Sequence, residues 1–386
     1  MATRVEFRQI YMPLDEGRSL EPDRPINLRR WREDFRVIQQ TGHCGVDIEG
    51  GSIFGKRLTQ IGYYPTATIQ RLLDLCVEAG LDAHLNVFSG LEPLADELPR
   101  ASQEDWLCRD AAGTELPVFN AYNPDWRARW LRPFLARLVE QYGTHPAVTG
   151  YRVGDVWHVP GRPDPALFRR FLKDRYADLG ALNAAWLTRL RSWDEITPPE
   201  IPMPWQQRWI DWSDAQGEWL AELAGDVVGS LHGVAGVARH EVFIYAPCWL
   251  TTSPGEMYAG FTQRSFKPFQ IIGVCGNYPH ERFSRDVGLA AIERSLAMMK
   301  CLAPHARLAL ADMPGPRWCD PYPDEFYSAD WMIAMMQRAI DCGASYVLYD
   351  GYRKARVATA VAHAQTFAYH QHILQQLAEF HRQANQ

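Results

Sequence analysis

Eight short runs rich in apolar and β-branched residues recur along the chain, separated by longer amphipathic stretches. Strands that are apolar almost throughout suit a parallel sheet covered by helices on both faces. Eight such units favour closure into a barrel over an open sheet. The sequence therefore predicts an α/β protein, a (β/α)8 TIM barrel with one domain over residues 1–386. The predicted strands cover 5–12, 44–51, 81–90, 148–157, 241–249, 269–278, 306–313 and 345–352.

The stretches between these runs have the apolar spacing of three and four residues that is typical of amphipathic helices. The fourth strand is followed by the largest insertion, an expanded helical excursion, and 91–123 is expected to be a long loop. The last helix is expected to pack against the first βα unit and complete the outer ring. The main predicted helices cover 26–42, 66–80, 125–143, 165–187, 205–233 and 360–383.

Charge and cysteine usage exclude several classes of function. The formal net charge is -6, with acidic and basic residues interspersed, so we expect neither a nucleic acid nor a membrane as partner. No apolar leader follows the first residues and no run of about 18 apolar residues occurs, so a cytoplasmic protein is expected. The eight cysteines form neither a CxxC pair nor a cluster at zinc-ligand spacing, so no metal and no cofactor are expected.

Carboxylates interrupt the apolar runs near the ends of predicted strands four, seven and eight. These are Asp155, Asp312 and Asp350. Barrel enzymes take their catalytic groups from the carboxyl ends of the strands, so the three side chains are expected to converge on one pocket. Cleavage of a glycosidic bond needs two such carboxyls, one to protonate the leaving oxygen and one to attack carbon or activate water. We predict Asp155 and Asp312 as the catalytic pair.

Other polar and aromatic residues are expected to shape a sugar pocket around this pair. Flat aromatic rings in the top loops can stack on the apolar faces of sugars, although most aromatics in a large barrel pack in its core. A strand-end carboxylate can likewise cap a helix or bind an arginine instead of acting on substrate. Asp47 and Asn86 also interrupt apolar strands. The predicted substrate-binding residues are Asp350, Asn277, Tyr278, Trp318, Tyr352, Trp157, Glu49 and Asn120.

The order and spacing of several segments resemble glycoside hydrolase family 42, the β-galactosidase family of the retaining clan A barrels. The likeness runs from about Asn120 to Arg356 and implies a small carbohydrate or glycoside as partner, with a homo-oligomer as one possible state. It is carried by YGTHPAVTGYRVGD (142–155), FRRFLKDRYADLGALNAAWL (168–187), SWDEITPP (192–199), GNYP (276–279), DMPGPRW (312–318) and SYVLYDGYRKAR (345–356).

The residues that match the two catalytic glutamates of that family are different here. An ungapped match places Val156 at the acid/base glutamate and Asp155 at the asparagine before it. The nucleophile position falls on Ala311, or on Asp312 if one residue is deleted. An aspartate is one methylene, roughly 1.5 Å, shorter than a glutamate, and a displacement of about 1 Å can cost on the order of a hundredfold in rate.

Three functions are compatible with these residues. The first is a glycosidase that uses Asp155 and Asp312. The second is a non-catalytic carbohydrate-binding barrel, which would explain Val156 and Ala311 directly. The third is a barrel enzyme of different sugar chemistry, an isomerase or lyase using Glu49 or His158, which metal dependence would reveal. No nucleophile elbow, GxGxxG or GxxxxGK[ST] pattern occurs, which disfavours a hydrolase triad and nucleotide binding.

Overall fold

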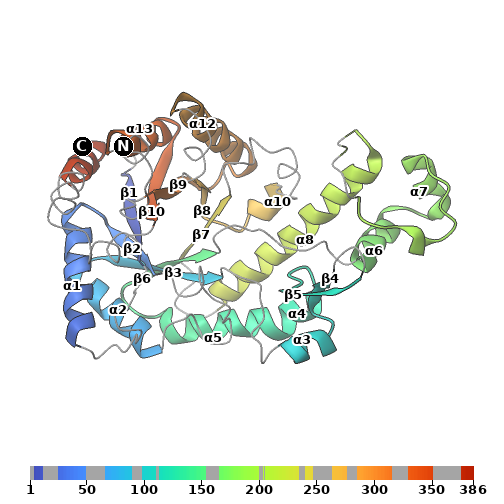
Figure 1. Cartoon of the computed structure of the whole chain (residues 1–386), viewed down its shortest axis with the longest axis horizontal. Helices are drawn as coiled ribbons and strands as arrows, with labels where there is room; N and C mark the ends of the chain where they lie inside the picture. The colour runs from blue at the N-terminus through green and yellow to red at the C-terminus, as the bar shows by residue number, and fades with distance from the viewer. Residues whose placement is uncertain are drawn as a thin grey trace.

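Eight parallel strands close into one barrel, as the sequence predicts (Figure 1). The computed structural model describes residues 4–11, 25–48, 66–88, 98–109, 113–153, 165–199, 203, 205–233, 240–246, 263–275, 285–314, 329–350 and 375–386. Around the barrel the strand order is β1-β10-β9-β8-β7-β6-β3-β2. The strands are β1 Glu6–Tyr11, β2 Gly45–Ile48, β3 Asp82–Phe88, β6 Val148–Val153, β7 Glu241–Ala246, β8 Ile271–Cys275, β9 Arg307–Pro314 and β10 Ala344–Asp350.

The strands are buried on both faces, which explains their almost continuous apolar sequence. In β8 all five residues are buried, because one face meets the barrel interior and the other meets the helices outside. Those helices are α1 Pro25–Gln40, α2 Thr66–Ala79, α5 Arg132–Tyr142, α8 Gln207–His232, α10 Gln263–Phe266, α12 Arg285–Leu302 and α13 Ala329–Asp341, with a last helix over 375–384. Of the helices in the described residues, none has the length and apolarity needed to cross a bilayer.

The prediction of a long loop over 91–123 was wrong in part. The segment contains helix α3, Leu98–Gln103, and an antiparallel pair made by β4, Leu107–Arg109, and β5, Glu115–Phe119. Gly113 precedes β5 with a φ of +84°, a conformation that favours glycine. The Pro and Gly content that suggests a loop therefore belongs partly to the turns of a small sheet.

The predicted helix over 125–143 is built from three consecutive pieces. Helix α4, Pro124–Trp126, begins at Asn123, whose side chain accepts from the backbone N–H groups of Asp125 and Trp126. A π-helical turn, η1 Arg127–Leu131, then leads into α5.

The excursion after β6 forms an arm with its own apolar cluster. Helices α6, Pro165–Arg175, and α7, Leu179–Trp186, lie on the side of α8 away from the barrel, followed by a 3₁₀ turn, η2 Trp193–Glu195 (Figure 1). The fully buried Asp211 accepts hydrogen bonds from Tyr176 and Trp186, both over 2.7 Å, which joins the arm to α8. The buried cluster comprises Tyr122, Phe168, Leu172, Leu182, Ile196, Trp209, Trp212, Ala215 and Trp219.

The C-terminal helix, described over 375–384, packs against the first βα unit, as predicted for the last helix. Residues 360–374 of the predicted helix lie outside the described residues. Phe380 lies edge-on to Phe7 of β1, with ring centroids 6.2 Å apart. Asn385 clasps the backbone of Val5: its Oδ1 accepts from the Val5 N–H over 2.8 Å, and its Nδ2 donates to the Val5 carbonyl. The two ends of the described chain therefore close the outer ring together.

Candidate functional site

The carboxyl ends of the barrel strands are where the sequence places the catalytic residues. Asp312 lies in β9 and Asp350 is the last residue of β10, so two of the predicted carboxylates are on neighbouring strands at this end. The backbone of Asp350 is in register with Pro314, two residues after Asp312. The other predicted residues Asp155, Trp157, Glu49, Asn277, Tyr278, Trp318 and Tyr352, together with Val156 and His158, lie outside the described residues.

Strand β9 contains one extra residue at the position of the predicted nucleophile. Leu310 is in register with Val347, but Met313 is in register with Tyr349, so three steps along β9 correspond to two along β10. A β-bulge of this kind interrupts the alternation of side chains between the two faces and changes the direction of a strand. The irregularity includes Ala311 and Asp312.

Ala311 itself lies on the interior phase of β9. Ala311 is in register with Cys275 of β8 and follows Arg307 by four residues. Because side chains alternate between the two faces of a strand, Ala311 and Arg307 lie on the same face of β9. The Arg307 side chain contacts Tyr346 across the end of the barrel, which identifies that face as the interior. The position of the family nucleophile in the ungapped alignment is thus a fully buried alanine.

Asn120, predicted to bind substrate, has a structural contact in the segment after β5. Its side-chain oxygen accepts from the Tyr122 N–H over 3.1 Å, and its own N–H donates to the Trp106 carbonyl over 2.7 Å. Only 5% of Asn120 is exposed. The side chain stabilises a turn before α4, and its role toward substrate stays a prediction.

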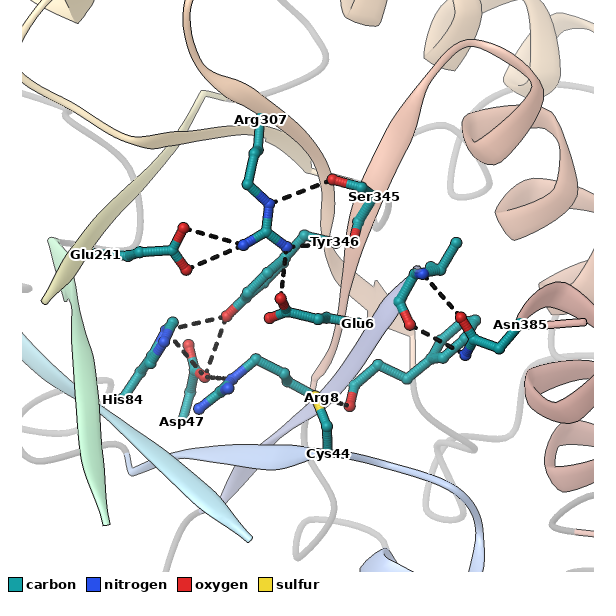
Figure 2. A network of polar contacts seen from close by, with 12 residues as sticks. Glu6, Arg8, Cys44, Asp47, His84, Glu241, Arg307, Ser345, Tyr346 and Asn385 are labelled. Carbon is teal, nitrogen blue, oxygen red and sulfur yellow. Dashed lines mark hydrogen bonds and ion pairs between the residues drawn. The ribbon is translucent and has the colours of Figure 1, made fainter. Parts of the chain in front are cut away.

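A cluster of five buried polar side chains occupies the barrel interior, here called the interior cluster: Arg8, Asp47, His84, Arg152 and Tyr346. Arg8 Nε donates to Asp47 Oδ1 over 3.1 Å, and Arg152 Nε lies 3.6 Å from Asp47 Oδ2. The Tyr346 hydroxyl donates to Asp47 Oδ1 over 3.3 Å and lies 3.2 Å from His84 Nδ1 (Figure 2). None of the five is more than 1% exposed.

Burial controls the protonation of this cluster. It raises the pKa of the Asp47 carboxyl, while the guanidiniums of Arg8 and Arg152 act in the opposite direction. Burial, and then the charge of Arg8, lower the pKa of His84 well below its usual range, so its imidazole is neutral. Burial also raises the pKa of Tyr346 well above its usual range. The carboxyl group of Asp47 thus lies between two guanidiniums, with the neutral His84 and Tyr346 beside it.

Two glycines make room for these side chains. A Cβ on Gly45 would lie 2.6 Å from Arg8 Cζ, and a Cβ on Gly150 would lie 2.6 Å from His84 Nε2 and from the Glu241 carbonyl oxygen. At Gly150 contacts that short require a shift of backbone or of the buried His84 ring, and at Gly45 they require the Arg8 guanidinium to move away. The absence of a side chain at these positions is thus part of how the cluster is built.

We expect Gly150→Ala to lower the free energy of unfolding by about 1–3 kcal/mol, the usual cost of overpacking a core. Gly229→Ala in α8 is the matched control, because its Cβ would meet nothing within 4 Å. That change should be neutral or stabilise by roughly 0.5–1 kcal/mol, since alanine is the better helix former. Urea unfolding of both variants measures the difference. Equal effects of the two changes would contradict the packing described for Gly150.

The amino-terminal end of the barrel, opposite the predicted catalytic site, is closed by a separate group of ion pairs. Arg307 lies between Glu6 and Glu241, at 2.8 Å and 3.0 Å, and its Nε also donates to the Ser345 hydroxyl (Figure 2). These charged side chains are about one-third exposed at the amino-terminal ends of their strands. Figure 2 shows the Tyr346 ring extending from this group to Asp47 and His84. In barrels this end contributes to stability, and the carboxyl end carries the chemistry.

The interior cluster was missed by the sequence analysis, except for Asp47. Asp47 was one of several polar residues noted near strand ends. It binds Arg8, and binding an arginine was the alternative to acting on substrate for such a carboxylate. Arg8 and His84 are polar residues within buried and mostly apolar strands. Their position on the interior-facing side of the strands was the signal available in the sequence. Among the described side chains, no group of three or more His, Cys, Asp or Glu is arranged to hold a metal ion.

The closed ring of eight parallel strands with helices outside it is a (β/α)8 barrel, with carboxylates at the carboxyl ends of two neighbouring strands. The model of glycoside hydrolase family 42, described as beta-galactosidase, matches residues 21–221, just over half of the chain. The chain belongs to this family.

Characterised relatives are distant and longer. Beta-galactosidase bgaB of Geobacillus kaustophilus is 26% identical over 187 residues, which are 44% of this chain and 27% of the relative. Beta-galactosidase BgaA of a Planococcus species is 24% identical over 218 residues, 52% of this chain and 30% of the relative. The chain thus matches less than a third of the length of either protein.

Solved structures share the fold over nearly the whole chain. The beta-galactosidase from the psychrophilic Marinomonas ef1 superposes with a TM-score of 0.70 at 17% identity, covering 96% of this chain and 59% of that one. The catalytic domain of the beta-amylase from Paenibacillus polymyxa gives a TM-score of 0.67 at 13% identity, covering 97% of this chain and all of that domain. At these identities the likeness establishes the fold.

Proposed function

We propose that this protein is a glycoside hydrolase that cleaves β-galactoside-like substrates with two strand-end aspartates. Asp155 is the acid/base and Asp312 the nucleophile or base. Family membership supports the substrate class, and the carboxyl-end location of Asp312 and Asp350 supports the placement of the site. The proposed substrate-binding residues are Asp350, Asn277, Tyr278, Trp318, Tyr352, Trp157, Glu49 and Asn120.

The extra residue in β9 is the observation that carries this proposal. Without it, strict alternation would assign Asp312 to the face opposite Ala311, toward the surrounding helices. With it, Leu310 and Met313 are in register with Val347 and Tyr349, two residues of β10 that face the surrounding helices. Ala311 and Asp312 therefore lie together between two outward-facing positions of β9, where a regular strand has one residue. A bulge can change the direction of a strand, so this irregularity supports the proposed role of Asp312 at the barrel mouth.

Two carboxyls of this kind suffice for glycoside cleavage. In glycosidases with such a pair, mutual repulsion and partial burial keep one carboxyl protonated, so that it donates a proton to the leaving oxygen while the other stays ionised. A separation of about 5 Å leads to retention of configuration through a covalent intermediate, and a wider one leads to inversion through an activated water.

A non-catalytic carbohydrate-binding barrel is the second candidate. The observation that favours it is Ala311, a fully buried alanine on the interior phase of β9, at the position that matches the family nucleophile. A barrel that has lost this carboxylate could retain its aromatic residues and bind sugar without cleaving it.

A panel of aryl glycosides tests the proposed function. It should contain galactosides, glucosides, arabinosides and fucosides of both anomers, incubated with the purified chain and followed by release of the phenol. We expect cleavage of a β-galactoside or a close stereochemical relative. If no glycoside is cleaved by folded protein and a free sugar raises its melting temperature, the binding barrel is the better description.

A further inference from the structure

Two buried histidines meet where the C-terminal helix joins the barrel. The imidazole of His381 stacks on Phe7 of β1, with ring centroids 3.8 Å apart and planes 17° apart. His43, which follows α1, approaches the same imidazole edge-on, with centroids 5.0 Å apart. The side chains of both histidines are almost wholly buried. This junction therefore joins α1, β1 and the C-terminal helix through two groups that titrate near neutral pH in water.

The hydrogen bonds of His381 identify its neutral form. Nδ1 lies 2.8 Å from the Thr41 carbonyl oxygen, which can only accept, so Nδ1 carries the proton. Nε2 is then an acceptor and lies 2.7 Å from the Tyr349 hydroxyl, which is also 2.7 Å from Met336 Sδ. One neutral imidazole thus bonds the turn after α1 to the outer face of β10, and the hydroxyl it binds belongs to the residue before Asp350.

The surroundings oppose protonation of either imidazole. Within the described residues, the titratable groups that face His381 are His43 and Tyr349, and no carboxylate is hydrogen-bonded or ion-paired to either histidine. Burial lowers the pKa of His381 to about 4. Burial, and then the neighbouring His381, lower the pKa of His43 well below its usual range. A stacked Phe7 ring offers a protonated imidazole a cation–π contact, which offsets only part of the lost hydration.

Close packing makes the junction specific to these side chains. Gly42, between Thr41 and His43, has a φ of +85°, and a Cβ there would lie 3.3 Å from His381 Cβ. The Asn385 clasp on Val5 lies one turn further along the C-terminal helix. A change in the charge of His381 therefore acts on the contact that holds this helix to the barrel.

We propose that Thr41, His43, Tyr349 and His381 form an acid-sensitive latch, in which protonation of His381 releases the C-terminal helix from β1 and breaks the contact between His381 and the Tyr349 hydroxyl on β10. The pKa of a histidine in water is about 6.5. Above that pH the latch is closed, because His381 is neutral in both the closed and the released state. As the pH falls from 6.5 toward 4, only the released helix gains a proton on His381, so the opening equilibrium shifts toward release. Between pH 8 and pH 5 this one group raises the opening constant roughly 30-fold.

Hydrogen exchange of residues 375–386, measured by mass spectrometry between pH 8 and pH 5 and corrected for the intrinsic chemical rate, tests the latch. We expect the corrected exchange of wild type to rise about 30-fold or more over this range. In His381→Gln most of the rise should be lost, whatever the baseline exchange of that variant, and only the smaller contribution of His43 should remain. His232→Gln in α8 is the matched control and should behave as wild type.

Two results would overturn the proposal: a corrected exchange that changes less than about threefold in wild type, or an equal rise in His381→Gln. If His381→Gln does not fold, His43→Gln decides, because it leaves His381 in place. That variant should keep most of the pH-dependent rise, and a complete loss would assign the effect to His43 alone. The experiment needs no substrate, so its outcome is independent of the proposed glycosidase activity.

Discussion

Asp312→Asn is expected to lower kcat by roughly a thousandfold or more on whichever aryl glycoside the wild type cleaves. The amide keeps the size of the side chain but neither attacks carbon nor activates water. Asp155→Asn should be similarly damaging on a substrate with a poorly acidic phenol, because that leaving group needs a proton from the acid. Both variants should bind substrate nearly as well as wild type, since the change is felt mainly in the transition state.

A series of leaving groups separates the two roles. With increasingly acidic phenols the loss in Asp155→Asn should shrink, because a good leaving group departs without a proton, whereas Asp312→Asn should stay equally slow for all of them. Asp286→Asn, an exposed carboxylate in the first turn of α12, is the matched control and should retain wild-type rates. A kcat for Asp312→Asn within tenfold of wild type would remove Asp312 from the mechanism and with it the argument from the β9 bulge.

Asp47→Ala is expected to lower the free energy of unfolding by about 3–5 kcal/mol, the typical loss when one partner of a buried ion pair is removed. The change leaves the buried guanidiniums of Arg8 and Arg152 without the carboxylate between them. It also removes the acceptor of the Tyr346 hydroxyl. Urea or thermal unfolding measures the loss, and a variant that cannot be purified folded agrees with the upper part of this range.

An exposed ion pair provides the comparison. Glu78 pairs with Arg32 over 3.0 Å, but the two side chains are 49% and 54% exposed. Solvent screens such a pair, so Glu78→Ala should cost about 0–1 kcal/mol. If Asp47→Ala costs no more than Glu78→Ala, the interior cluster is not an essential part of the barrel core.

The barrel could be predicted from the sequence because its signal is local and repeated. Each strand is an apolar run a few residues long, and each helix shows a spacing of three and four, so burial on one or two faces is written into every segment separately. The strand ends were accurate to within about two residues where the structure describes them: the run predicted over 306–313, for example, gave β9 at Arg307–Pro314. The hairpin of β4 and β5 was missed because its strands are only three and five residues long.

The candidate site was predictable to a smaller extent. A carboxylate at a strand end is visible in the sequence, and so is the mismatch between this chain and the two family glutamates. The bulge in β9 was not visible, because it is a relation between the registers of β9 and β10, and nothing in LADMPG by itself specifies it. Whether Asp312 or Ala311 stands at the functional position is therefore a question of strand pairing and not of residue type.

The sequence by itself determined the class of fold, the order of its elements and the candidate carboxylates, since hydrophobic periodicity and strand-end position are properties of a single segment. Only the tertiary structure decided which polar residues meet. Arg8 and Tyr346 are more than 300 residues apart, yet they lie on adjacent strands because β1 and β10 close the barrel. Asp47 is an ion-pair partner inside the barrel, and His381 completes a junction with Thr41, because closure brings the two ends of the chain together. Contacts of this kind depend on how the ring of strands closes, which no local pattern encodes.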